Sequence, residues 1–360
     1  MPDLIKTLHL RVKDKHAKLL LAQAKEVNMV WNYCNETSIK ILERENRFCS
    51  GYDLDKLTAG SSKELSIKSQ TIQLVSKEFV SRRVQFKKRR LNWRVSKGSK
   101  RSLGWVPFKK SSIVYKNGQI WYNKKPISLW DHYGLSQYDL GTGSFSEDSK
   151  GRWYFNVTAK VTPKINTATT AIGIDLGLKA CATTSEGSVL EGRNFRKLES
   201  KLATAQRANK KKQVRSIHAK IKNRRKDELH KFSSHLVNTN SAIFVGDVSS
   251  SKLIKTKMAK SVNDAGWYKF KTMLEYKCRW AGVVFGEVNE SYSTQTCSQC
   301  GSIEGPKGLK GLGIREWKCS ECGTVHDRDV NAAKNILRRG LSTLAEEIQS
   351  LPGLEVTTRV

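Results

Sequence analysis

Residues 171–187, AIGIDLGLKACATTSEG, carry the clearest fold signal in the second half of this chain. Its pattern predicts an apolar strand, a turn containing glycine and a second strand. Asp175 stands at the end of the first strand, where the apolar run AIGI meets Leu176 and Gly177. A carboxylate in such a position is often structural. It becomes a candidate catalytic residue only if other acids converge on it.

The segments after this stretch alternate between helix and strand. Residues 193–231 predict a long basic helical hairpin, and the apolar run AIFVG that ends at Gly246 predicts a buried strand. A helix over residues 265–281, a strand over 283–288 and a final helix beginning near Asp329 follow.

The segments before it have a different character. Residues 104–162 contain short runs such as QIWYN and WYFNVTAKV, separated by NG, GTGS and SKGR turns, which predict a small antiparallel β-barrel. Residues 1–40 predict a strand followed by a helix, and residues 46–101 a mainly helical, increasingly basic insert. Pro163 and the polar linker after it indicate a domain boundary.

Positive charge dominates the composition. The 360 residues include 65 Lys and Arg against 33 Asp and Glu, a formal net charge of +32. Self-repulsion of this size opposes compaction, so we expect a polyanionic partner. Nucleic acid fits better than acidic lipid because the cations are spread over most of the chain. No apolar run is long enough to cross a membrane and the start lacks a signal-peptide pattern, so we expect a cytoplasmic, nucleoid-associated protein.

Two segments concentrate this charge. Residues 79–110 hold twelve Lys and Arg and no acid, interleaved with aromatic residues such as Trp93 and Trp105. Residues 193–231 hold fifteen Lys and Arg against three acids. A solvated helix face usually mixes both signs, so these segments predict surfaces that follow phosphates. The candidate nucleic-acid contacts are Arg82, Arg83, Lys87, Lys88, Arg89, Arg90, Lys210, Lys211, Lys212, Arg224 and Arg225.

Two CxxC knuckles form the strongest local signal. Cys297 and Cys300 make the first knuckle, and Cys319 and Cys322 make the second, with eighteen residues between them. Four thiolates at this spacing suit one tetrahedral Zn²⁺, and a closed four-thiolate site leaves no position for substrate. The sequence therefore predicts one structural zinc ion. The other four cysteines are scattered, which suits a reducing compartment.

A second acidic site lies in HDRDVNAAKN, residues 326–335, just before the final helix. An aspartate at a helix start is most often an N-cap, so Asp329 alone is not diagnostic. Cleavage of a polynucleotide by two Mg²⁺ ions needs several converging carboxylates. Asp175 and Asp329 would still need a third acid, which composition and spacing do not identify.

The order of these motifs resembles the C-terminal half of the TnpB family. GIDLG, SYSTQTCSQCG, a second CxxC and HDRDVNAAKNIL are similar to motifs of TnpB proteins and of the compact type V CRISPR effectors related to them, over residues 170–340. The resemblance implies a RuvC-like nuclease of RNase H fold with a zinc ribbon inserted before its last motif. It also implies that Asp175 and Asp329 match the first and last metal-binding carboxylates, and it leaves the role of nearby Asp327 open.

Together, the patterns and the resemblance predict an α+β multidomain chain. A small wedge-type β-barrel with a helical recognition insert is followed by the nuclease domain. The expected boundaries are 1–40 and 102–165 for the barrel, 41–101 for the insert, 166–296 for the RuvC-like domain, 297–325 for the zinc ribbon and 326–360 for the last RuvC-like motif and tail.

The sequence departs from the common family pattern at the second catalytic motif. Many relatives end the fourth strand with Glu-Asp, the glutamate being catalytic, whereas this chain has Gly246 and Asp247. Glu290, Glu287 and Asp247 are the candidates for the missing carboxylate, and the remaining possibility is a dead site. We favour Glu290, because it directly precedes SYSTQTC at a strand end where a RuvC-like site opens and some family branches carry an acid there.

RNA-guided DNA cleavage by a transposon-encoded endonuclease is the function that the resemblance implies. Asp175, Glu290 and Asp329 would hold two Mg²⁺ ions for phosphodiester hydrolysis. The partners would be a guide RNA derived from the transposon and double-stranded target DNA. The alternative is a nuclease-inactive RNA-guided DNA-binding protein or repressor. A zinc-ribbon factor of RNA metabolism and a strand-transfer transposase account for fewer of the motifs.

Overall fold

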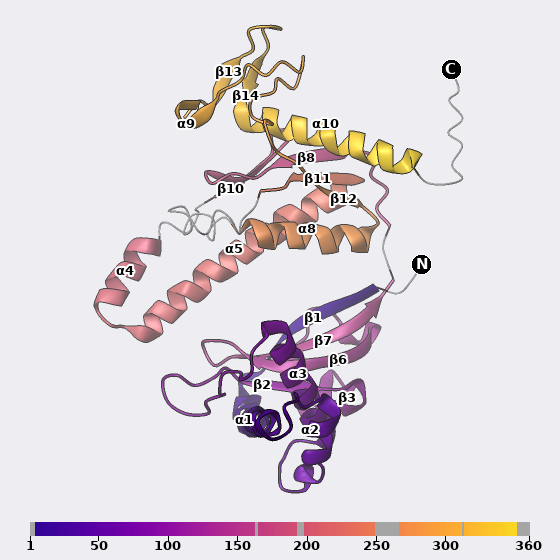
Figure 1. The fold of residues 1–360 in the computed structure, drawn as a ribbon, viewed down its shortest axis with the longest axis vertical. Coiled ribbons are helices and arrows are strands. Elements are labelled where there is room, and N and C mark those ends of the chain that lie inside the picture. The colour runs from indigo at the N-terminus through magenta and orange to yellow at the C-terminus, as the bar shows by residue number, and fades with distance from the viewer. Residues whose placement is uncertain (1–3, 163–164, 193–197, 249–265, 312, 351–360) are drawn as a thin grey trace. The chain divides into compact units, whose positions relative to one another are not determined.

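The chain forms two compact units, Met1–Thr162 and Pro163–Val360, and each is described by itself (Figure 1). The structure is a computed structural model that describes residues 4–162, 165–192, 198–248, 266–311 and 313–350. Within these ranges, no helix combines the length and the apolar character needed to span a membrane.

A curled antiparallel sheet forms the centre of the first unit. Its strands run in the order β2-β6-β7-β1-β5-β4-β3. Their bounds are β1 (Leu4–Val12), β2 (Trp105–Phe108), β3 (Ile113–Lys116), β4 (Gln119–Tyr122), β5 (Lys125–Trp130), β6 (Asp139–Glu147) and β7 (Trp153–Val161). The prediction of antiparallel strands is correct, but the sheet stays open as a half-barrel because β2 and β3 are its two free edges.

Helices α1 (Ala17–Glu45) and α3 (Ser69–Phe86) pack against β2 of this sheet, and α2 (Gly51–Leu57) packs against α3. Helix α1 buries an apolar stripe that includes Leu20, Val27 and Cys34. The predicted helical character of residues 46–101 ends at Phe86, because the following residue, Lys87, has a left-handed φ of 50°.

An extended segment replaces the expected helix after Lys87. Two asparagines on one face of α1 hold its backbone. The side chain of Asn35 accepts from the Leu91 N–H (3.1 Å) and donates to the Leu91 carbonyl (2.8 Å). Asn32 makes the same pair of bonds to Arg94, at 2.8 and 2.9 Å. These amides satisfy backbone groups that a helix would have paired internally.

A mixed five-stranded sheet forms the core of the second unit. The strands β8 (Ala171–Asp175), β9 (Ala180–Thr184), β10 (Val189–Glu191), β11 (Ala242–Gly246) and β12 (Val284–Val288) run in the order β10-β9-β8-β11-β12. β8, β11 and β12 are parallel to one another, and β9 and β10 are antiparallel to their neighbours. All five residues of β11 are buried, as expected for a parallel strand that is covered on both faces.

Helices cover both faces of this sheet (Figure 1). α5 (Lys211–Thr239) and α8 (Trp267–Ala281) pack against the face that carries Ile243 and Val245. α10 (Arg328–Gln349) packs against the face that carries Phe244. Gly173 of β8 allows α10 to approach closely, because a Cβ there would lie 2.1 Å from the Ala333 carbonyl oxygen.

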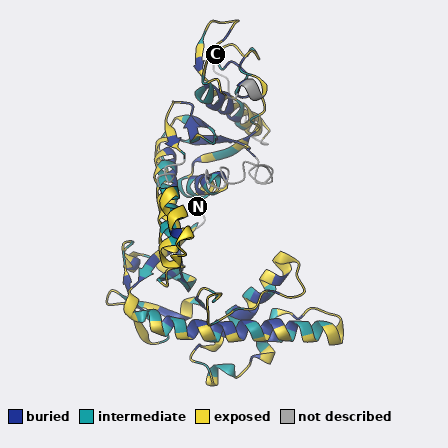
Figure 2. Cartoon of the chain, turned by 90° about the vertical axis from the view of Figure 1, so that its left-hand side faces the viewer, coloured by how far each residue is buried: buried dark blue, intermediate teal, exposed yellow. Residues whose placement is uncertain are grey.

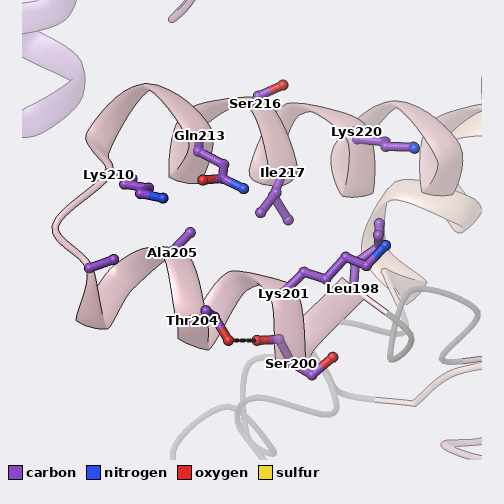
Figure 3. Close-up of a pocket in the computed structure, with 11 residues that line it drawn as sticks. Leu198, Ser200, Lys201, Thr204, Ala205, Lys210, Gln213, Ser216, Ile217 and Lys220 are labelled. Atoms are coloured by element: carbon purple, nitrogen blue, oxygen red, sulfur yellow. Dashed lines mark hydrogen bonds between the residues drawn. The ribbon is translucent and has the colours of Figure 1, made fainter.

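The predicted basic hairpin consists of α4 (Glu199–Arg207) and α5, which pack against each other. The segment 193–197 lies outside the described residues. A shallow cleft of about 470 Å³ runs between the two helices and is lined by Lys201, Lys210 and Lys220 among others (Figure 3). The cysteine-bearing segment that follows β12 contains α9 (Gly308–Gly311) and the two-stranded ribbon β13 (Glu316–Lys318) and β14 (Val325–Asp327).

Candidate active site and zinc ribbon

Three parallel strands bring acidic residues to one edge of the mixed sheet. Asp175 is the last residue of β8, Asp247 directly follows β11, and Glu290 lies two residues after β12. Because these strands are parallel neighbours, their carboxyl ends meet at the same edge, where sites of open α/β sheets commonly lie. Asp329, in the first turn of α10, reaches this edge from the adjoining layer and raises the pKa of Asp175.

Glu290 fills the space beside Gly246. A Cβ built on Gly246 would lie 2.8 Å from Glu290 Oε2 and 3.3 Å from Glu290 Cβ. The glutamate therefore occupies the volume that a side chain at position 246 would need. Asp247 supports this placement, because its Oδ1 accepts a hydrogen bond from the Glu290 N–H at 3.2 Å.

Burial and the repulsion between like charges raise the pKa values of two acids in this cluster. Burial, followed by the negative charges of Asp329 and Glu290, raises the pKa of Asp175 to about 7, while Arg328 acts in the opposite direction. Burial and the charge of Asp247 raise the pKa of Glu290 to about 6. Carboxyl groups whose pKa is raised by burial and by like charge are typical of functional sites, and a bound cation would offset both effects.

Asp327 and Asp329 have different roles at the start of α10. Asp327 is the N-cap: its Oδ1 accepts from the N–H groups of Asp329 (3.0 Å) and Val330 (2.9 Å). Asp329 is freed from capping and forms ion pairs instead. Its Oδ2 accepts from Arg315 Nη1 at 2.8 Å, and its Oδ1 accepts from Arg328 Nη2 at 3.0 Å.

The carboxylate oxygens of Asp175, Glu290 and Asp329 do not all lie within 4.8 Å of one another. Over the described ranges, the four cysteines are the one group of three or more His, Cys, Asp or Glu residues whose ligand atoms all lie within 4.8 Å of one another. The donor set of Asp175, Glu290 and Asp329 suits a hard cation such as Mg²⁺. Asp329 would first have to exchange its two arginines for that cation.

Glu287, another candidate from the sequence, forms a different contact. Its Oε2 accepts from Lys271 Nζ at 2.6 Å, which connects β12 to α8. The three candidates therefore have different contacts. Glu287 is paired with Lys271, Asp247 accepts a hydrogen bond from the Glu290 N–H, and the Glu290 side chain lies next to Gly246.

The four knuckle cysteines form a compact cluster. The Sγ atoms of Cys297 and Cys322 are 3.6 Å apart, and those of Cys300 and Cys319 are 3.7 Å apart. Tetrahedral coordination with Zn–S bonds of about 2.3 Å requires S–S separations of about 3.8 Å, so the residues fit one structural zinc ion.

His326 is a ribbon residue that the sequence analysis missed. Its Nε2 lies 3.0 Å from Cys297 Sγ, and its ring packs against Trp317 with centroids 4.9 Å apart. His326 pairs with Trp317 across β13 and β14. Its position three residues before Asp329 was visible in the sequence, but no local pattern shows that it faces the thiolate.

The predicted nucleic-acid contacts divide by exposure. Lys87, Lys88, Arg89 and Arg90, together with Lys210, Lys211, Lys212 and Arg224, are exposed, and much of the first half of α5 faces solvent (Figure 2). Arg82 is exposed and paired with Glu78, whereas Arg225 is half-buried. The prediction for Arg83 is wrong: only 5% of it is exposed, because its guanidinium donates to Ser38 Oγ and the Cys49 carbonyl inside the core.

The fold and these sites define the class of protein: a mixed α+β chain with a Cas12f-like fold and a four-cysteine ribbon. A solved Cas12f1–sgRNA–target DNA complex contains a protein chain that superimposes with a TM-score of 0.58, over 93% of this chain and 98% of that one, at 13% identity. At this identity the likeness concerns the fold alone.

The chain belongs to the TnpB family, which confirms the resemblance seen in the motifs. Residues 154–257 match the OrfB_IS605 family, described as "Probable transposase", and residues 267–336 match the "Cas12f1-like, TNB domain" family. A candidate RNA-guided DNA endonuclease of Streptomyces pristinaespiralis is 35% identical, over 69% of this chain and 66% of that protein. The TnpB-like protein L79 of Acanthamoeba polyphaga mimivirus is 29% identical, over 61% of this chain and 45% of that protein. The chain thus matches about half to two thirds of the length of these relatives.

Proposed function

We propose that this chain is an RNA-guided DNA endonuclease whose active site is the cluster of Asp175, Glu290 and Asp329. The observation that carries the proposal is the position of Glu290 in the space beside Gly246. Glu290 thus brings a glutamate side chain from the loop after β12 to the end of β11, where the family motif has one. The mixed sheet would be the RuvC-like core of RNase H fold, and the curled sheet with its helices would be the wedge-type domain.

The three carboxylates would together hold Mg²⁺. Magnesium in such sites activates water and stabilises the leaving 3′ oxygen. The raised pKa values of Asp175 and Glu290 support this, because a cation would offset the burial and like charge that raise them. Asp329 would turn from Arg315 and Arg328 toward the cation, which leaves two guanidinium groups near the position of an incoming phosphate.

Guide RNA and target DNA would be held mainly through their phosphates. The exposed cations of residues 87–90 and of the α4–α5 hairpin support this, because cations far outnumber acids in both segments: residues 79–110 hold no acid, and residues 193–231 hold three. Sequence specificity would come from base pairing between guide and target rather than from side chains that read bases.

The test compares cleavage with binding. The protein would be co-expressed with the DNA that flanks its gene, purified with its RNA, and incubated with a target library in Mg²⁺. Asp175→Ala and Glu290→Ala should abolish cleavage and leave target binding intact. Glu287→Ala is the matched control, because it removes a carboxylate from the same β12 region that contacts Lys271 instead of the cluster.

A second candidate function is guide-directed DNA binding without cleavage. The glycine at position 246 and the pairing of Asp329 with two arginines favour it. Wild-type protein that binds guide-matched DNA but does not cut it in Mg²⁺ would establish this function and overturn the nuclease. Cleavage that Glu290→Ala retains in full would instead show that another acid completes the site.

A further inference from the structure

The segment that carries Glu290 is a loop, not a strand end. Residues 289–296 have no helix or strand, and Tyr292 holds a left-handed φ of 61°. The loop is turned by hydrogen bonds from the Ser293 N–H to the Glu290 carbonyl (3.0 Å) and from the Thr296 N–H to the Tyr292 carbonyl (2.9 Å). A carboxylate on a loop needs external support, because a catalytic group must be held within about 0.5 Å of its working position.

Arg339 of α10 supplies such support on both sides of Glu290. Its Nη1 donates to the Asn289 carbonyl at 2.7 Å and to the Ser291 carbonyl at 2.8 Å. These two residues are the immediate neighbours of Glu290 in the chain. One guanidinium nitrogen therefore fixes the backbone before and after the glutamate.

Two buried asparagines continue this contact along α10. Asn335 Nδ2 donates to the Ser293 carbonyl (2.9 Å) and to the Thr296 carbonyl (2.6 Å). Asn331 Nδ2 donates to the Thr296 carbonyl at 2.8 Å, and its Oδ1 accepts from the Ser298 N–H at 2.8 Å, inside the first zinc knuckle. Both asparagines are 1% exposed.

The spacing of the three side chains matches the helix. Asn331, Asn335 and Arg339 stand four residues apart, so they line one face of α10, the helix that begins beside Asp329. We call these three residues the α10 clamp. The same helix thus carries one acid of the proposed active site and holds the loop that carries another.

We propose that the α10 clamp positions Glu290 for metal binding, with Arg339 as its decisive member. This inference rests on the proposed function, in which Glu290 replaces the glutamate that the family usually has at the β11 end. A glutamate in a strand would be placed by the sheet itself. A glutamate moved to the following loop is placed by Gly246 on one side, which leaves it room, and by Arg339 on the other, which fixes its backbone.

Arg339 is the member to test, because it is only half-buried and its removal leaves the helix core intact. The asparagines are fully buried, so their loss would also affect folding. Arg339→Ala should slow single-turnover cleavage by the guide-loaded complex about 10- to 100-fold, the usual cost of removing a group that orients a metal ligand. Arg339→Lys should recover part of that loss, because an ammonium can still donate to one carbonyl.

A readout other than cleavage separates positioning from general stability. Mn²⁺ binding to the guide-loaded complex without target, followed by electron paramagnetic resonance, should weaken in Arg339→Ala and in Glu290→Ala to similar degrees. Zinc content, melting temperature and target binding should stay as in wild type. Lys334→Ala is the matched control, because it removes an exposed cation from the same helix, and it should leave Mn²⁺ binding unchanged.

Three outcomes would overturn the inference. The first is Mn²⁺ binding by Arg339→Ala at the wild-type level. The second is a loss in Arg339→Ala that is confined to target binding, which would make Arg339 a phosphate contact. The third is a fall in the melting temperature of Arg339→Ala that accounts for the whole effect. If wild type binds its target but does not cut, the proposed nuclease function fails. The Mn²⁺ comparison would then still decide whether Arg339 supports a cation site at Glu290.

Discussion

Gly246→Ala changes one atom at the point where Glu290 enters the proposed active site. The added Cβ would lie 2.8 Å from Glu290 Oε2 and 3.3 Å from both Glu290 Cβ and Ile336 Cδ1. The carboxylate oxygen would have to withdraw by roughly 0.6 Å to reach an ordinary van der Waals contact. Ile336, packed in the core, has little freedom to move away, so the flexible glutamate is the group that shifts.

The expected loss is in rate rather than in stability. A misplacement of about 1 Å can cost about 100-fold in an enzyme, so a shift of this size should slow cleavage roughly 10- to 100-fold. The free energy of unfolding should change by about 1 kcal/mol or less. The cost of tighter packing is offset by the smaller conformational freedom of alanine in the unfolded chain.

The assay is single-turnover cleavage of guide-matched DNA at saturating Mg²⁺, alongside target binding and melting temperature. Gly286→Ala on the neighbouring strand is the control, because its Cβ would meet the Phe244 ring at 3.1 Å and no atom of Glu290. Wild-type cleavage by Gly246→Ala, with Glu290→Ala inactive, would refute the reasoning. Glu290 would then not act from the place that the structure gives it.

Four further substitutions test the Asp175 carboxyl, the cysteine cluster and two arginines of the first unit. In the metal-free protein the pKa of Asp175 is raised to about 7, so its contribution to stability is complete below about pH 4 and is lost as the pH rises through 7. Asp175→Asn should therefore flatten the fall in melting temperature between about pH 4 and pH 7, and an unchanged slope would contradict this. Cys322→Ser should reduce bound zinc, measured by elemental mass spectrometry, well below one ion per chain and lower the free energy of unfolding by several kcal/mol; retention of a full zinc ion would rule out its role as a ligand. Arg83→Ala should lower the free energy of unfolding by about 2–3 kcal/mol, because the bonds to Ser38 and Cys49 are lost in the core. Arg89→Ala should leave stability unchanged and reduce the salt slope of nucleic-acid binding by about one. A loss of stability in Arg89→Ala, or a changed salt slope in Arg83→Ala, would show that exposure does not separate structural from nucleic-acid-binding arginines.

Sequence patterns were sufficient where the physics is local. Each CxxC motif brings two thiols near one another by local geometry, and the two motifs form one cluster. The strands of residues 171–184, 242–246 and 284–288 are also visible as short apolar runs between turn and helix signals. The ordered motifs around the ribbon were specific enough to indicate the family.

Local sequence patterns were less informative about where a side chain points and whether it is exposed. Arg83 belongs to a run of cations in the sequence, yet it stands on the inner face of α3 and points at Ser38 and Cys49. The helical pattern of residues 46–101 stops at Phe86, because side chains of α1 offer the following backbone a better set of partners. Both outcomes depend on contacts with residues more than thirty positions away.

The family, the four-cysteine cluster and two candidate acids, Asp175 and Asp329, could be predicted from sequence motifs. Which acid stands in the space left by Gly246 depends on long-range packing. Glu287, Glu290 and Asp247 all lie near strand ends, so the sequence does not distinguish them. Glu290 is the one that occupies this space, because β11 pairs in parallel with β12 and α10 holds the loop after β12 by hydrogen bonds. Sheet register and helix packing bring acids more than one hundred residues apart in the chain to the same edge of the sheet, which no local pattern encodes.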